Sequence, residues 1–233
     1  MTLGTELSTF ITGLNGGVTI DPTLLAVLVN SAQAIIEEER PWMVLRKTDT
    51  SKTVTTASLY TTAIDISTIT DFSRFFGEFA VRLFDGDNLI QYYRQVPWDR
   101  RLEYKDVSNT FCFDENAKKI YLNGTVPFNG TLYINFISTS TLIDIASESA
   151  VWALFPSRFL PLIGFYANEM WKGAVDYDSI NRQMIPEHKA IYQALKNAMC
   201  EWDNLKQLSI VDENDPTEFV GNFPRNGAIN RYD

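Results

Sequence analysis

Residues 79–96 read FAVRLF, DGDN and LIQYYRQV, and this stretch decides the fold class. Val81 and Leu83 alternate with Ala80 and Arg82, and such alternation predicts a β-strand. The Asp85-Gly86 pair follows, and glycine tolerates the positive φ that a tight turn requires. The stretch therefore predicts a β-hairpin that turns at residues 85–88.

Strand signals continue on the carboxyl side of this hairpin. Residues 110–113 and 119–122 predict a second hairpin, because aromatic and β-branched residues are enriched in strands. Leu132, Ile134 and Phe136 alternate in a further strand. Since strands joined by tight turns pair in opposite directions, we expect an antiparallel sheet.

A longer connection separates the two hairpins. It contains Pro97, Trp98 and the basic pair Arg100 and Arg101. Connecting segments lie at the surface and often carry binding residues. We therefore interpret Trp98, Arg100 and Arg101 as candidate partner-binding residues.

Helical spacing precedes the β region. Apolar residues from Leu7 to Leu14 predict a first helix that ends at Gly16-Gly17. Asp21 and Pro22 predict the N-cap and first residue of a second helix, which must end before Pro41. Its apolar stripe comprises Leu24, Leu25, Leu28, Ala32, Ile35 and Ile36. The three glutamates at residues 37–39 fit a solvent-exposed face and a basic partner equally well.

Helical spacing returns after Asp144. One stripe comprises Phe159, Leu162, Ile163, Tyr166, Ala167, Met170 and Trp171, and another comprises Ile191, Tyr192, Leu195, Met199, Trp202 and Leu205. We expect two antiparallel helices joined near residues 176–178. Each stripe needs a partner, so we expect a core shared with the N-terminal helices. Its predicted members are Leu25, Leu28, Ile35, Phe159, Ile163, Tyr166, Leu195 and Trp202.

These patterns predict an α+β fold. A helical unit combines an N-terminal helix pair, residues 1–41, with a C-terminal helix hairpin, residues 144–208. A large antiparallel β insertion, residues 42–143, projects between them. Residues 209–233 contain too few apolar side chains for a core of their own, so we expect an extended C-terminal arm.

Composition narrows the functional classes. The 233 residues carry a formal charge of -9, which excludes a protein that grips nucleic acid over a broad basic face. No apolar run approaches the roughly 20 residues of a membrane-spanning helix, and we expect no membrane association. The start of the chain lacks signal-peptide features, so we expect Cys112 and Cys200 to be reduced thiols.

The sequence offers little for catalysis. His188 is the one histidine, and no second reactive group stands at a catalytic spacing from it. We expect it to be structural. Asp85 and Asp87 begin like a calcium loop, but the later ligands are missing. We predict no enzymatic activity, no metal and no cofactor.

Three sequence features carry a family resemblance. The N-terminal helices run from Ile20-Asp21-Pro22 to Pro41-Trp42, the stretch Phe155-Pro156 with Phe159 opens a later helix, and Asp176 lies at the following helix turn. Together with the middle β region, these features resemble the head-to-tail adaptor proteins of tailed bacteriophages. The resemblance spans residues 1–208.

The resemblance implies a structural function. Adaptors of this family form a ring, typically twelvefold, that joins the portal protein to tail or tail-hub proteins. DNA passes through the channel without specific binding. The resemblance thus implies a ring homo-oligomer in the virion neck, assembled in the cytoplasm of the bacterial host. An acidic channel wall is consistent with the charge of the chain.

The C-terminal arm supplies further candidate partner-binding residues: Phe219, Phe223, Arg225, Arg231 and Tyr232. Sparse aromatic and arginine side chains suit separate pockets on a neighbour, so we expect the arm to bind another subunit or the portal. Two alternatives stay open. One is a tail-associated glycan-binding β module with aromatic sugar platforms, and the other is a hydrolase that uses Asp176 or Asp178.

Overall fold

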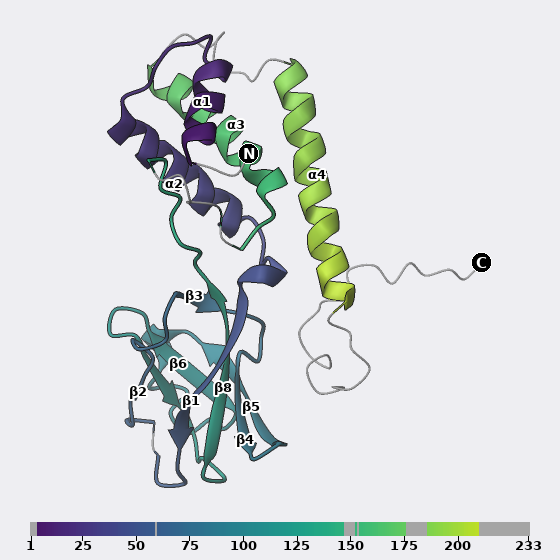
Figure 1. Ribbon diagram of the computed structural model, residues 1–233. Helices are drawn as coiled ribbons and strands as arrows, with labels where there is room; N and C mark the ends of the chain where they lie inside the picture. The colour runs from purple at the N-terminus through teal and green to yellow at the C-terminus, as the bar shows by residue number, and fades with distance from the viewer. Residues whose placement is uncertain (1–3, 59, 147–151, 153, 176–185, 210–233) are drawn as a thin grey trace, which may run out of the picture. The chain divides into compact units, whose positions relative to one another are not determined.

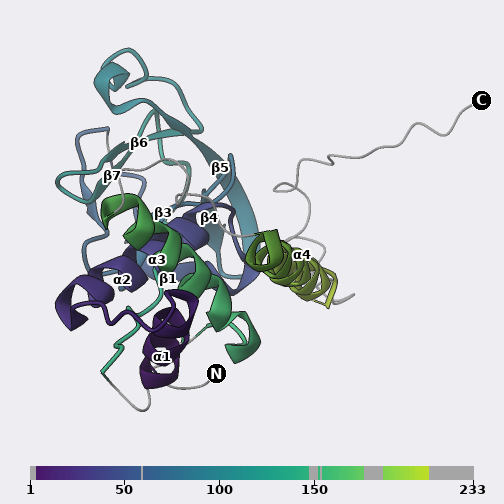
Figure 2. The same ribbon diagram turned by 90° about the horizontal axis from the view of Figure 1, so that it is seen from above.

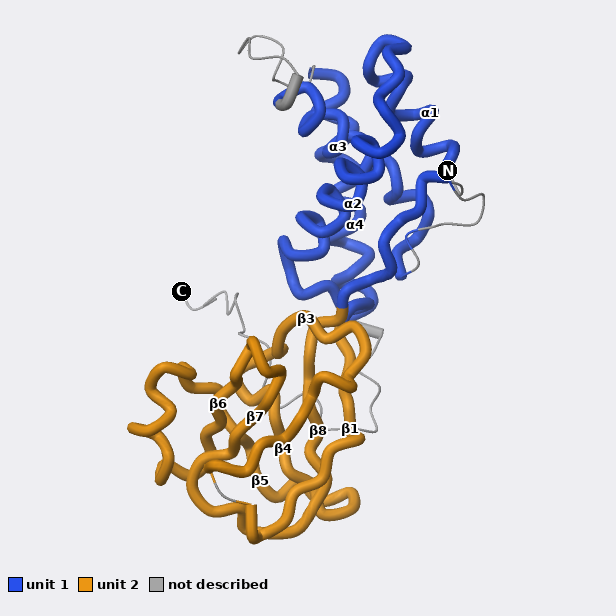
Figure 3. Tube along the Cα trace, turned by 90° about the vertical axis from the view of Figure 1, so that its left-hand side faces the viewer, with its two compact units in different colours: residues 1–45, 139–210 blue, residues 46–138, 211–233 orange. Residues whose placement is uncertain are grey.

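The computed structural model describes residues 4–58, 60–146, 152, 154–175 and 186–209. The described residues form two compact units (Figure 3). The helical unit draws on residues 1–45 and 139–210, and the β unit on residues 46–138. Helices and a large sheet thus occupy separate parts of the chain, which agrees with the predicted α+β class.

The helical unit contains four α-helices and two single turns of 3-10 helix (Figure 1). Their bounds are α1 Gly4–Leu14, α2 Pro22–Glu38, η1 Met43–Leu45, η3 Ser157–Phe159, α3 Leu160–Val175 and α4 Pro186–Ser209. Both α1 and α2 contact α3, and α4 contacts α3, η1 and η3. Seen from above, α4 lies at the edge of this unit (Figure 2).

Local capping sets the helix ends where the sequence predicts them. The Asp21 side chain accepts hydrogen bonds from the backbone N–H groups of Thr23, at 3.0 Å, and Leu24, at 3.1 Å, ahead of Pro22. These bonds satisfy donors that have no partner inside the helix. Gly16 and Gly17 follow α1 with φ of 66° and 87°, and such left-handed residues stop a helix. The predicted starts and stops are confirmed.

The buried face of α2 differs in part from the predicted stripe. Leu25, Leu28, Ala32 and Ile36 are buried, but Leu24 is exposed. In the shared core, Phe159 and Ile163 are also buried, whereas Ile35, Tyr166, Leu195 and Trp202 are only half-buried. Helical spacing shows which residues share one face of a helix, but it does not show how much of that face a neighbouring helix covers. The burial of these residues was therefore predicted wrongly.

A buried polar network fastens α2 to the segment that returns from the β unit. Glu37 accepts hydrogen bonds from Gln33 Nε2 at 3.1 Å, Trp152 Nε1 at 2.7 Å and the Ser140 hydroxyl. Gln33 also accepts a bond from the backbone N–H of Ile143 at 3.0 Å. The glutamate run is therefore not uniformly solvent-exposed, because Glu37 belongs to the interior.

An ion pair holds α4 against the end of α2. Arg40 lies 2.8 Å from Asp203, whose side chain is completely buried, and Asp203 also accepts a hydrogen bond from the backbone N–H of Met43 at 2.6 Å. Lys196 on α4 pairs with Glu39 at 2.8 Å. Polar contacts thus fix one side of α4.

The β unit contains an eight-stranded sheet. Its strands are β1 Arg46–Val54, β2 Ile64–Asp65, β3 Phe72–Phe75, β4 Val81–Asp85, β5 Asn88–Val96, β6 Thr110–Asp114, β7 Lys119–Leu122 and β8 Gly130–Ser138. The order is β1-β8-β4-β5-β6-β7-β2, and β3 also pairs with β8. One cluster of buried side chains, including Val81, Leu83, Tyr93, Phe111 and Phe136, forms the core.

The two predicted hairpins are present, but the sheet is not wholly antiparallel. Asp85 pairs with Asn88 across a turn in which Gly86 has φ of 59°, and β6 pairs with β7 antiparallel. By contrast, β5 and β6 run parallel. The prediction of a purely antiparallel insertion is therefore wrong. Residues 97–109 provide the long connection that a parallel pair requires.

The unit boundaries lie inside the predicted β region of residues 42–143. Trp42 and Leu45 are buried in the helical unit, and Trp42 donates from Nε1 to the carbonyl of Ile36 at 2.8 Å. On the return side, Ile143 is also buried in the helical unit. Arg46 at the start of β1 pairs with Ile137 near the end of β8. The chain therefore leaves the helical unit and returns to it through two neighbouring strands.

None of the helices in the described ranges combines the length and apolar character that crossing a membrane requires.

Core packing on α2 predicts unequal responses to two leucine substitutions. Leu28 is 6% exposed and Leu24 is 40% exposed. Leu28→Ala should lower the free energy of unfolding by about 2–5 kcal/mol because it leaves a cavity. Leu24→Ala, the matched control, should change it by less than about 0.5 kcal/mol. Urea unfolding followed by circular dichroism measures both, and equal losses would contradict the assigned buried face.

Candidate partner-binding surfaces

The first residues of the loop between β5 and β6 form a short turn at the surface of the β unit. Pro97 precedes the single turn η2, Trp98–Arg100, and its fixed φ suits entry into a helical turn. The backbone N–H of Arg101 donates to the carbonyl of Trp98 at 3.2 Å. A short rigid turn thereby holds Trp98, Arg100 and Arg101 at the surface of the β unit, as the sequence predicts for a connecting segment.

Trp98, Arg101 and Tyr121 lie in contact with one another and are here called the Trp98 cluster. The Arg101 guanidinium lies 4.4 Å from the centre of the Trp98 ring and 5.8 Å from that of Tyr121. The two aromatic ring centres lie 5.3 Å apart. Cation–π attraction of this kind stabilises an exposed arginine in one position. The sequence analysis missed Tyr121, because β7 is brought beside the loop only by the fold.

Gly124 anchors the far half of the same loop. Its N–H donates to the carbonyl of Lys105 at 2.8 Å, and its φ is +70°. A Cβ atom at this position would lie 2.7 Å from the Cα of Ser108. Only glycine combines this backbone conformation with so close an approach, so Gly124 fixes where the loop lies.

Cys112 lies beneath the loop and is a buried free thiol. Its sulfur is 3.6 Å from Asn123 Nδ2 and 4.0 Å from the carbonyl oxygen of Pro97. Burial raises the pKa of the Cys112 thiol, against smaller opposing effects of the Asn123 hydrogen bond and the Arg101 charge. The thiol is therefore protonated at neutral pH, whereas a nucleophilic cysteine needs a lowered pKa.

The raised pKa of Cys112 predicts slow alkylation of the folded chain. Iodoacetamide reacts with the thiolate, and a raised pKa lowers the thiolate fraction at pH 7. In a Cys200→Ser variant, folded Cys112 should react at least tenfold more slowly than in urea, and its rate should still be rising above pH 9. Mass spectrometry measures the labelling. Equal rates in folded and unfolded chains at pH 7 would contradict the assigned environment.

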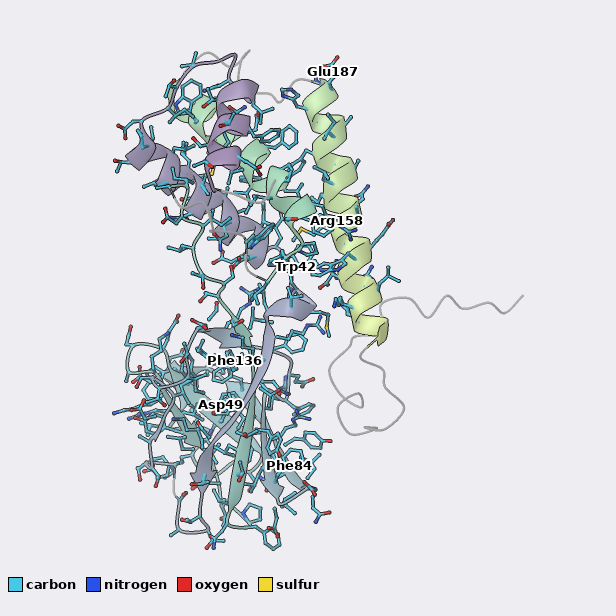
Figure 4. The ribbon with its side chains drawn as sticks, viewed as in Figure 1. Trp42, Asp49, Phe84, Phe136, Arg158 and Glu187 are labelled. Carbon is cyan, nitrogen blue, oxygen red and sulfur yellow. The ribbon has the colours of Figure 1, made fainter. Side chains whose placement is uncertain are left out.

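A second surface lies on α4. Glu187, Ile191, Ala194, Ala198, Glu201 and Leu205 recur at helical spacing and are all exposed; we call them the α4 outer face. Figure 4 shows Glu187 in the first turn of the helix. Ile191 is 50% exposed and Leu205 is 64% exposed. Ile191 and Leu205 belong to the predicted apolar stripe of this helix, but they do not share its buried side, where Met199 and Asp203 lie.

The α4 outer face differs in charge from the other sides of the helix. It contains two glutamates and no basic residue, whereas Lys196 lies on the side that pairs with Glu39. Lys189 and Lys206 also project away from it, as their helical angles require. The surface is therefore apolar and acidic over about 27 Å of helix, from Glu187 to Leu205 at 1.5 Å per residue.

His188 and Glu169 lie at the contact between α3 and α4. The His188 ring is 5.6 Å from the ring of Phe165. Burial raises the pKa of Glu169, while the charges of Lys172 and His188 oppose this shift. Among the residues with a described position, no three His, Cys, Asp or Glu side chains gather as a metal site. The histidine thus packs against an aromatic ring at a helix contact.

The arm residues Phe219, Phe223, Arg225, Arg231 and Tyr232 lie outside the described residues. So do Asp176 and Asp178, on which the hydrolase alternative rests. The structure therefore brings together Trp98 and Arg101 from the predicted set, with Arg100 beside them in η2. It adds Tyr121 and the α4 outer face.

Comparison with known proteins found no match: no protein-family model and no curated protein matches the chain.

Proposed function

We propose that this chain is a structural head-to-tail adaptor of a tailed bacteriophage, which forms a ring between the portal and the tail and leaves a channel for DNA. The α4 outer face is the observation that carries the proposal. A 24-residue helix leaves Ile191 and Leu205 half or more exposed. Ala194 and Ala198 lie between them on the same exposed face, and an apolar stripe of this kind supports an interaction site.

The arrangement of the helical unit supports the same proposal. In the proposed adaptor, the N-terminal helix pair and the C-terminal helices form the ring body, and the β unit is inserted between them in the sequence. Contacts of α3 with both α1 and α2 join the two chain segments. This is the order of elements on which the family resemblance rests.

Charge is divided unequally between the two units. Residues 46–138 contain 11 acidic and 11 basic residues, whereas residues 1–45 and 139–210 together contain 13 acidic and 7 basic residues. A ring body with excess negative charge repels the DNA backbone. DNA then moves through the channel without being held, as an adaptor requires.

The glycan-binding alternative meets an obstacle at the Trp98 cluster. A sugar platform needs an uncovered aromatic face, but the guanidinium of Arg101 stacks over the Trp98 ring at 4.4 Å. An exposed arginine on an aromatic ring instead suits a protein interface, where tryptophan, tyrosine and arginine are enriched. The cluster therefore favours a protein partner over a glycan.

Assembly state tests the proposed function. The purified chain should form closed rings, either alone or when mixed with a portal protein, because in the proposed ring other copies or the portal cover the Trp98 cluster and the α4 outer face. Sedimentation velocity and electron microscopy of single particles measure this. A chain that stays monomeric in both conditions, and is stabilised by oligosaccharides, would replace the adaptor by the glycan-binding module.

The arm gives a separate test. A chain that ends at Leu208 should keep its fold, because Met199 and Asp203, the last buried residues among those of α4 with a described burial, precede the deletion. It should lose ring stability or portal binding if the arm binds a neighbour. Unfolding midpoints and portal pull-down measure the two effects. Unchanged assembly of the truncated chain would remove the arm from the proposal.

A further inference from the structure

We infer that the β5–β6 loop of one copy binds the α4 outer face of the next copy. The loop surface consists of the Trp98 cluster with Arg100 and Leu102. This inference rests on the proposed ring and names the two surfaces that would form its repeating contact.

The loop surface offers unpaired positive charge on a rigid base. Arg100 and Arg101 are exposed, and neither forms an ion pair with a described residue, although Lys105 pairs with Asp106 at 3.9 Å in the same loop. Stacking on Trp98 fixes the Arg101 guanidinium before any partner arrives. Leu102, 64% exposed, adds an apolar contact beside the arginines. Little side-chain freedom is then lost on binding.

The α4 outer face offers the complementary chemistry. Glu187 and Glu201 are exposed and form no ion pair with a described residue. Between them, Ala194 and Ala198 have short side chains, whereas Ile191 and Leu205 project further. The two glutamates are therefore complementary to Arg100 and Arg101, and Ile191 and Leu205 to Leu102, whereas Asp99 and Glu103 of the loop must point away from the contact.

The occupant is a second copy because each chain carries one surface of each kind. If the loop of one copy binds α4 of the next, the pair still has one free α4 face on the first copy and one free loop on the second. Such a contact is heterologous, and it repeats until the rotation between copies closes a ring. A twofold dimer would instead use both loop–α4 contacts at once and stop at two copies, which sedimentation velocity distinguishes from a ring.

Charge reversal tests the contact directly. Arg100→Glu and Glu201→Arg should each weaken self-association at least tenfold, because each places like charges opposite one another. The double variant Arg100→Glu with Glu201→Arg should recover association to within about threefold of the unchanged chain, since the pair is restored with reversed sign. Sedimentation velocity over a concentration series measures association, in the condition where the unchanged chain forms rings.

Two controls separate the contact from folding and from general charge. Lys189→Glu alters an exposed residue on another side of α4 and should leave association unchanged. Arg100, Lys189 and Glu201 are all exposed, so the unfolding midpoints of the three charge variants should equal that of the unchanged chain. Trp98→Ala should weaken association as strongly as Arg100→Glu, because it removes the support of Arg101.

Each outcome separates this inference from the proposed function. Single variants that form rings as the unchanged chain does would overturn the inference and leave the adaptor function standing. The same conclusion follows if the double variant does not recover self-association, or if the variants change only the stability of the monomer. It also follows if Glu201→Arg loses portal binding but keeps self-association. An unchanged chain that never forms rings would overturn both.

Discussion

The buried carboxylate of Glu37 is the interaction on which the helical unit depends. An acid taken out of water costs several kcal/mol unless donors surround it. Here Gln33, Ser140 and Trp152 supply them, and two of the three lie on the segment that returns from the β unit. The carboxylate therefore ties α2 to chain made a hundred residues later. Without these hydrogen bonds, the segment that contains Ser140 and Trp152 would no longer be held against α2. Because α3 follows this segment in the chain, its position against α1 and α2 depends on them.

Local features of the fold could be predicted from the sequence, because their causes lie within a few residues. The N-cap at Asp21 and the turn at Gly86 each follow from side-chain chemistry or backbone freedom at one position. Features with distant causes could not. The glutamate run gave no sign that Glu37 alone turns inward, and no turn signal showed that β5 and β6 run parallel.

The candidate surfaces follow the same division. Trp98 and Arg101 could be found as a basic and aromatic loop, since loop composition is local. Tyr121 could not, because it joins them from a strand whose place in the sheet depends on pairing with β6. Ile191 has the spacing of a core residue and yet is exposed. Spacing marks which residues of a helix share a side but does not say whether a neighbour covers that side.

Building the helical unit from two separated segments has a consequence for the order of synthesis. All strand pairings of the β unit lie within residues 46–138, whereas α1 and α2 need α3 as their partner. Residues 39–159 separate α2 from α3, and at about 5–20 residues per second the ribosome needs on the order of ten seconds to make them. The apolar faces of Leu7, Ile11 and Leu28 stay uncovered during that interval. The β unit thus emerges whole before the helical unit can close.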